Sequence, residues 1–195
     1  MPMAVIEQLK AERNRVRMQI GGIRNGQQRL GEWNKCESQY FNRFDALLDG
    51  SFFGPRWLQE TSVANIIADA LHGRDEKDYN LIAYSIMPNH VHLICELVGR
   101  LSSRPRVKPD TSRAEARLTP LANVLRLIKG STARESNLVL GRSGSFWQKE
   151  GYDHIIHDDD ELERTIWYVI ENPVKAGLAE KWEEWPWNYC KPELI

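Results

Sequence analysis

The sequence predicts an α+β protein in which helices and a small antiparallel sheet form a single domain. Before residue 75, apolar residues recur at helical spacing in three stretches, and none of these alternates as a strand would. Two neighbouring apolar stretches after residue 80 carry the strand signal, with a turn between them. We therefore expect a helical region over residues 1–60, and the α+β domain with an aromatic C-terminal tail over residues 61–195.

The three early helices are expected over residues 4–20, 38–48 and 62–71. Gly21-Gly22 ends the first apolar stripe, and Asp49-Gly50 ends the second. The strand signal that follows is typical of a tight hairpin. Residues 81–87 are rich in β-forming side chains, Pro88-Asn89 marks a turn, and residues 90–98 alternate.

The second half of the chain predicts a loop, two helices and one more strand. Residues 101–118 are rich in Ser, Pro, Arg and Lys and are expected to form a loop. A helix should begin at Thr119-Pro120 and run to about Asn137, with residues 121, 125, 128 and 132 on its inner stripe. A short strand is expected within residues 146–156, and Asp158 should begin a helix that Asn172-Pro173 ends.

Composition excludes several classes of protein. Apolar residues make up 42% of the chain, which is enough for a core, yet no apolar run approaches the length of a membrane span. The three cysteines form no CxxC pair, so we expect neither a disulfide framework nor a cysteine zinc site, and we expect a cytoplasmic location.

The net charge of −1 hides an uneven distribution. Residues 100–142 hold ten Lys or Arg against three acids, whereas residues 150–184 hold eleven acids against three bases. The basic middle, with Arg126, Lys129 and Arg134 on its helix, could contact phosphates or could be a solvated surface. Trp147 beside Lys149 is a candidate platform for stacking an unpaired base, with core packing as the alternative.

The first candidate for chemistry is His90-Val91-His92. Side chains at i and i+2 of a strand point the same way, so the two imidazoles could share one cation. The spacing also occurs by chance. The second candidate is Tyr168 with Asn172, one helical turn apart on a flank away from the apolar stripe. This pair could face a ligand, or Tyr168 could be a surface residue and Asn172 only a cap before Pro173.

These motifs together resemble those of a known family. Met87-Pro88-Asn89-His90-Val91-His92-Leu93-Ile94 resembles the His-hydrophobic-His signature of the small single-tyrosine HUH transposases of bacterial insertion sequences. The stretch from Tyr168 to Leu178, with Asn172-Pro173-Val174, resembles the catalytic helix of that family. Phe146-Trp147-Gln148 and Trp185-Pro186-Trp187 are similar to the branch called REP-associated tyrosine transposases. The resemblance covers roughly residues 50–190.

The resemblance implies a ferredoxin-like antiparallel sheet with flanking helices and a metal-dependent DNA nickase. His90, His92 and Asn172 would bind Mg²⁺ or Mn²⁺, and Tyr168 would be the nucleophile. Attack by Tyr168 on single-stranded DNA beside a hairpin, such as a REP-like palindrome, would form a 5′-phosphotyrosine link and release a 3′-hydroxyl. From charge, we expect Arg126, Lys129, Arg134 and the loop over residues 100–117 to contact the DNA backbone.

One departure from the family pattern leaves a second function open. The family's sheet usually opens with a strand that nothing before Leu81 matches, so the chain is expected to lack it, as a truncated sequence would. The alternative is therefore a catalytically impaired or domesticated protein that binds DNA hairpins. A third hypothesis is a metal-dependent hydrolase in which Tyr168 has only a structural role. The expected partner is DNA in the bacterial nucleoid, with no membrane, and the expected state is a monomer, with a swapped homodimer as the alternative.

Overall fold

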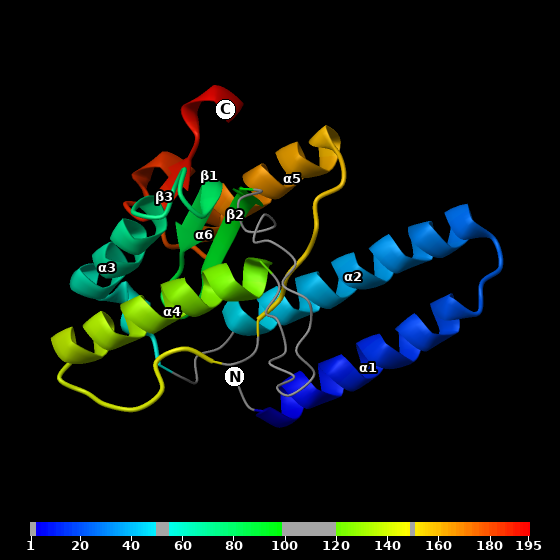
Figure 1. Cartoon of the computed structure of the whole chain (residues 1–195), viewed down its shortest axis with the longest axis horizontal. Coiled ribbons are helices and arrows are strands. Elements are labelled where there is room, and N and C mark those ends of the chain that lie inside the picture. Colours follow the sequence, from blue (N-terminus) through cyan, green and yellow to red (C-terminus); the bar gives the residue numbers. More distant parts are fainter. Residues whose placement is uncertain (1–2, 50–54, 99–119, 149–150) are drawn as a thin grey trace, which may run out of the picture. The chain divides into compact units, whose positions relative to one another are not determined.

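The computed structural model describes residues 3–49, 55–98, 120–148 and 151–195 (Figure 1). Helices and a three-stranded antiparallel sheet make up the fold, which confirms the predicted α+β class. The chain divides into two compact units, Met1–Pro55 and Arg56–Ile195. The predicted loop over residues 101–118 lies outside the described residues.

The first unit is a helical hairpin of α1 (Met3–Gly21) and α2 (Gly26–Asp49). The second helix begins twelve residues earlier than the predicted start at Ser38, because the non-helical segment between the two helices is confined to residues 22–25. Charge pairing joins the two helices at Glu37, which forms an ion pair with Arg13 and lies 3.8 Å from Arg17. The Arg13 guanidinium also lies 4.5 Å from the centre of the Tyr40 ring.

The second unit contains the sheet, built from β1 (Tyr79–Ile86), β2 (Val91–Leu97) and β3 (Asn188–Cys190). The strands lie in the order β2-β1-β3, and both pairs are antiparallel. The hairpin of β1 and β2 confirms the prediction. Among the described residues no strand precedes Tyr79, and β2 pairs with β1 alone.

A β-bulge in β1 decides which side chains face which side of the sheet. Leu81 pairs with Cys95 and Ala83 pairs with Ile94, so Ile82 is an extra residue on β1. This extra residue reverses the alternation, because successive side chains in a strand point to opposite faces. Tyr79 and Tyr84 consequently lie on the same face although they are five positions apart, an odd number.

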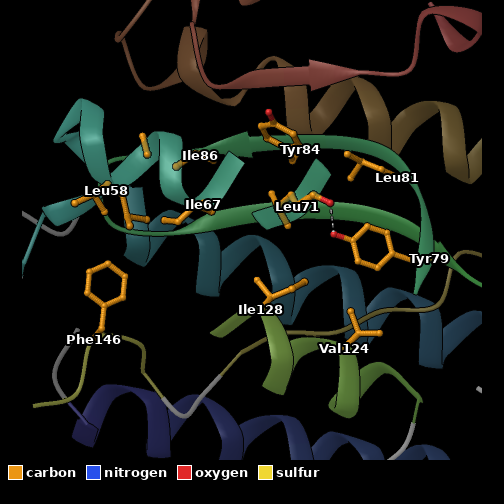
Figure 2. Packing of buried hydrophobic residues seen from close by; sticks show 12 residues of the cluster. Leu58, Ile67, Leu71, Tyr79, Leu81, Tyr84, Ile86, Val124, Ile128 and Phe146 are labelled. Carbon is orange, nitrogen blue, oxygen red and sulfur yellow. Dashed lines mark hydrogen bonds between the residues drawn. The ribbon is translucent and has the colours of Figure 1, made fainter. Parts of the chain in front are cut away.

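One face of the sheet is covered by α3 (Thr61–His72) and α4 (Pro120–Val139). The buried side chains of this α3–α4 core are shown in Figure 2, and they come from both helices, from β1, from the short 3-10 helix before α3 and from the loop after α4. They are Leu58, Val63, Ala64, Ile67, Leu71, Tyr79, Leu81, Tyr84, Ile86, Val124, Ile128 and Phe146. The odd-numbered residues of β2, from Val91 to Leu97, pack on the same core, as the alternation predicts.

The opposite face of the sheet is covered by α5 (Asp159–Ile170). Its buried residues Ile166, Val169 and Ile170 pack with Ala83, Ile94 and Cys190 to form a second cluster, the α5 core. Asp158 begins the helix as predicted, because its carboxylate accepts a hydrogen bond from the Glu161 N–H at 2.7 Å. The even-numbered residues of β2 face α5, so the sheet places His92 on this side.

The aromatic tail docks on both faces of the sheet, and it adds a strand that the sequence did not indicate. Trp182 packs on the α5 core and Trp187 on the α3–α4 core. The Trp185 indole donates to the Ile86 carbonyl at 3.0 Å, and Lys191 N–H donates to the Ile82 carbonyl at 2.8 Å. These bonds align the three residues of β3 beside β1.

Two local predictions are wrong. The described residues between 146 and 156 contain no strand. Phe146 and Trp147 both pack on the α3–α4 core, whereas neighbouring side chains in a strand would point to opposite faces. On α4, the buried residues are Val124, Ile128, Thr132 and Ser136, so the inner stripe runs through Val124 rather than through Leu121 and Leu125, which are half-buried.

No helix in the described ranges is both long enough and apolar enough to span a membrane.

The Tyr79 hydroxyl gives a test of the α3–α4 core. Burial raises the pKa of this fully buried phenol, and its O–H donates to the Leu71 carbonyl at 2.7 Å (Figure 2). Changing Tyr79→Phe should lower the free energy of unfolding in urea by about 1 kcal/mol, because a buried carbonyl loses a donor. The control Tyr189→Phe alters a half-buried phenol and should change stability by less than about 0.5 kcal/mol. Equal losses in the two variants would contradict this role of the Tyr79 hydrogen bond.

Candidate functional site

The β1–β2 hairpin brings the two predicted histidines together. His90 precedes β2 and His92 is its second residue, and both point toward the α5 side of the sheet. Their Nε2 atoms lie 3.0 Å apart, with the ring planes at 89°. The Asn89 side-chain oxygen lies 2.8 Å from His90 Nδ1, so it can accept the proton of that nitrogen. This arrangement leaves the His90 Nε2 lone pair directed at His92.

Asn172, which is distant in sequence, also lies beside these histidines. Its side-chain nitrogen lies 3.0 Å from His92 Nε2, although eighty positions separate the two residues. Asn172 is 1% exposed, so the prediction that it lies on a flank away from the core is wrong. That prediction treated residues 158–172 as one continuous helix, but α5 ends at Ile170. A new short helix, α6 (Asn172–Lys175), follows, and its first turn contains Pro173, which has no N–H. We call His90, His92 and Asn172 the His-Asn cluster.

Tyr168 lies beside the His-Asn cluster on the last turn of α5. Its half-buried ring packs against the α5 core, and its centre lies 6.0 Å from that of His92 in an edge-to-face arrangement. The Lys175 ammonium lies 4.7 Å from the centre of the same ring. The Tyr168 ring therefore lies near both the His92 ring and the Lys175 ammonium. The sequence prediction paired Tyr168 only with Asn172 and missed Lys175.

A hydrogen-bonded row across the sheet supports the end of α5. His92 on β2 pairs with Ser85 on β1, and Ser85 pairs with Asn188 on β3. The side-chain nitrogen of Asn188 donates to the Ile170 carbonyl at 2.8 Å and to the Trp182 carbonyl at 3.0 Å. Asn188 thus ties the last residue of α5 to the sheet. No sequence pattern pointed to this residue, because β3 was not predicted.

The predicted DNA-contacting residues do not lie with the His-Asn cluster. Arg126 and Arg134 are exposed on α4, which covers the opposite face of the sheet. Lys129, on the same helix, donates from Nζ to the Gln148 carbonyl at 3.1 Å. Trp147 packs on the α3–α4 core and its indole donates to Thr132 Oγ1 at 2.9 Å. Lys149 lies outside the described residues.

His154 and His157 lie near the N-terminal end of α5. His154 Nε2 is 2.8 Å from one Glu161 carboxylate oxygen, and the His157 N–H donates to the other at 2.8 Å. Burial alone would raise the pKa of Glu161, but these hydrogen bonds lower it below its usual value. Because α5 has twelve residues, it is about 18 Å long and separates both histidines from Asn172.

The donor atoms of the His-Asn cluster fit a divalent cation. Two ligands at 90° on a cation, each with a bond of about 2.1 Å, lie about 3 Å apart. His92 Nε2 lies at that separation from both His90 Nε2 and the Asn172 side-chain nitrogen. Rotation of the amide by a half-turn would direct its oxygen, a better ligand, to the same point. Three protein ligands would leave positions open for water or a phosphate oxygen on a cation with six.

Comparison with known proteins gives one partial relative. A protein of Haemophilus influenzae described as "Putative REP-associated tyrosine transposase" is 26% identical over 110 residues. The match covers 56% of this chain and 58% of that protein, so this chain matches little more than half the length of its relative. No protein-family model matches the chain, and no solved structure matches it.

Removal of the Asn188 side chain tests the support of α5. Asn188→Ala should lower the free energy of unfolding by about 2 kcal/mol, because the carbonyls of buried Ile170 and half-buried Trp182 both lose their donor. It should also speed amide hydrogen exchange at the α5–α6 junction, where Glu171 N–H is bonded to the Trp167 carbonyl. Asn80→Ala is the matched control, since the Asn80 amide bonds only to the exposed Glu96 carboxylate on the same sheet. Unchanged amide exchange at the junction in Asn188→Ala would show that Asn188 does not stabilise the end of α5.

Proposed function

We propose that this protein is a metal-dependent single-tyrosine nickase and strand transferase of single-stranded DNA. The observation that carries the proposal is the meeting of three nitrogen atoms, from His90, His92 and Asn172, beside the ring of Tyr168. The residues come from two distant parts of the sequence. Both parts are those whose motifs resemble the single-tyrosine transposases, and the partial relative carries a transposase description.

The His-Asn cluster would hold the cation, Mg²⁺ or Mn²⁺. Asn89 supports this role, because its contact with His90 Nδ1 leaves Nε2 as the ligand atom. Burial of Asn172 keeps its amide at a fixed place while the Asn188 tether holds the end of α5. When bound, the cation would stabilise the negative charge that develops on the phosphate oxygens and on the leaving oxygen.

Tyr168 would supply the nucleophile. Its phenolic oxygen attacks the phosphorus, a new P–O bond to Tyr168 forms, and the bond from phosphorus to the 3′ oxygen breaks. The phenol loses its proton and the released 3′ oxygen gains one, so the 5′ end of the DNA stays on the protein and the other end is a 3′-hydroxyl. Because the phosphodiester bond is exchanged for another ester, a second 3′-hydroxyl can reverse the step without ATP.

Single-stranded DNA beside a hairpin is the proposed substrate. A phenol fixed beside a folded helix can attack a phosphodiester only if the strand can bend toward it, and unpaired DNA is the more pliable form. REP-like palindromes are the hairpins that the sequence resemblance implies. We propose that the protein acts as a monomer in the bacterial nucleoid. The alternative is a swapped homodimer, in which two copies exchange α5.

The covalent step gives the test of this function. Incubation with labelled single-stranded hairpin DNA and Mn²⁺ should give an adduct that survives a denaturing gel. Tyr168→Phe should abolish the adduct, since no nucleophilic oxygen remains, and His92→Ala should reduce it by at least about 100-fold. Tyr152→Phe, which changes another half-buried tyrosine, should leave it unchanged.

The possible results separate the alternatives. Cleavage without an adduct, unaffected by Tyr168→Phe, would indicate a hydrolase that uses water. Binding without cleavage in any metal would indicate a protein that only binds DNA hairpins. Either result would contradict the proposed nickase.

The basic face of α4 gives a separate prediction about DNA contact. If Arg126 and Arg134 contact phosphates, replacing both with Gln should reduce the slope of log affinity against log salt by about 1.4, at about 0.7 per phosphate for single strands. Filter binding over 50–200 mM salt, roughly the range in which such contacts weaken, measures the slope. An unchanged slope would exclude these two arginines, and would leave α4 outside the DNA path.

A further inference from the structure

Lys175 is the charged residue beside Tyr168 that neither sequence motif explained. It is the last residue of α6, and its side chain is exposed while its ammonium lies 4.7 Å from the centre of the Tyr168 ring. A cation at this distance over an aromatic face is attracted by the ring. The contact brings a full positive charge to the residue that the proposed function makes the nucleophile.

The backbone around Lys175 is fixed by a standard helix ending. Its N–H donates to the Glu171 carbonyl at 3.0 Å, and the Leu178 and Gly177 N–H groups donate to Pro173 and Val174. Gly177 has a φ of 69°, a left-handed conformation that a residue with a Cβ adopts at a cost of about 1 kcal/mol or more. The turn thus holds the start of the Lys175 side chain close to the Tyr168 ring.

Within the described ranges, no acid neutralises the charge of Lys175. Among the residues that the structure describes, no carboxylate forms an ion pair with its ammonium. Glu171, the acid nearest to it in sequence on this helix, is in the C-cap of α5 and is half-buried. An ammonium with three donors beside a nucleophile is therefore available to an anion.

We infer that Lys175 is a further catalytic residue, which binds a non-bridging oxygen of the phosphate that Tyr168 attacks. The inference rests on the proposed function. An attacking oxygen and its phosphorus approach to about 3–3.5 Å, so the phosphate comes close to the Tyr168 ring and to the ammonium above it. Lys175 then exchanges its contact with the ring for a charge-assisted hydrogen bond to the phosphate. Its charge stabilises the negative charge that grows on the phosphoryl oxygens during the attack.

The test compares adduct formation by four proteins at saturating DNA and Mn²⁺: wild type, Lys175→Met, Lys175→Arg and Lys191→Met. Methionine keeps the apolar stem over the ring but removes the charge, so the rate should fall by about 100-fold. Arginine keeps the charge and should restore the rate to within about 10-fold of wild type. Lys191→Met, an exposed lysine elsewhere in the same unit, should leave the rate unchanged.

A modified substrate separates a phosphate contact from a merely structural contact with the ring. A methylphosphonate at the cleaved position replaces one non-bridging oxygen with methyl and removes the negative charge. Lys175→Met should slow reaction of this neutral substrate by less than about 5-fold, because the ion pair is already absent. The Mn²⁺ affinity, measured in parallel, should be the same in wild type and in Lys175→Met.

The outcomes distinguish this inference from the function on which it depends. If wild type forms the adduct and Lys175→Met forms it equally fast, Lys175 is not catalytic while the nickase function stands. Equal slowing of both substrates would also overturn the inference, since it would indicate that Lys175 only holds the ring. If wild type forms no adduct, the proposed function fails, and this inference fails with it.

Discussion

The contact between Asn172 and His92 is the constraint on which the candidate site depends, because it joins parts of the chain that are eighty residues apart. Nothing local holds these two residues together. The contact requires α5 to pack on one face of the sheet through Ile166, Val169 and Ile170, and it requires the helix to end where it does. Pro173 imposes that ending, and the Asn188 amide fixes it to the sheet through the Ile170 carbonyl. A small sheet therefore positions a polar cluster that no single element could form.

The bulge at Ile82 gives the sheet two different faces. One face carries large side chains for α3 and α4, and the other carries Ala83 and Ser85, which leave room for the end of α5. Full burial of Ser85 fits this division, since a larger residue there would meet the helix that holds Tyr168. The same division separates the α4 arginines from the His-Asn cluster. A DNA strand that contacted both would have to pass around the edge of the sheet.

The sequence predicted those parts of the structure whose signals are local. The hairpin, the Asp158 cap and the sharing of one face by His90 and His92 all follow from strand alternation or from capping, and the structure agrees. The errors arose where tertiary packing decided the outcome. A helical wheel treats α5 and Asn172 as one isolated helix, so it placed Asn172 away from the core. The strand predicted within residues 146–156 is absent from the described residues there, because Phe146 and Trp147 both pack on the α3–α4 core. The strand β3 was not predicted, because its three residues are too few to show a periodic pattern.

The proposed nickase function depends on the binding of one divalent cation by His90, His92 and Asn172 beside Tyr168. The most direct measurement is electron spin echo envelope modulation of the protein with one equivalent of Mn²⁺, which detects nitrogen nuclei bonded to the metal. We expect modulation from two imidazole nitrogens in the wild type and from one in His92→Ala, and a weaker Mn²⁺ affinity with both imidazoles retained in Asn172→Ala. Mn²⁺ that binds without imidazole modulation, or with modulation unchanged in His92→Ala, would show that the His-Asn cluster is not the metal site.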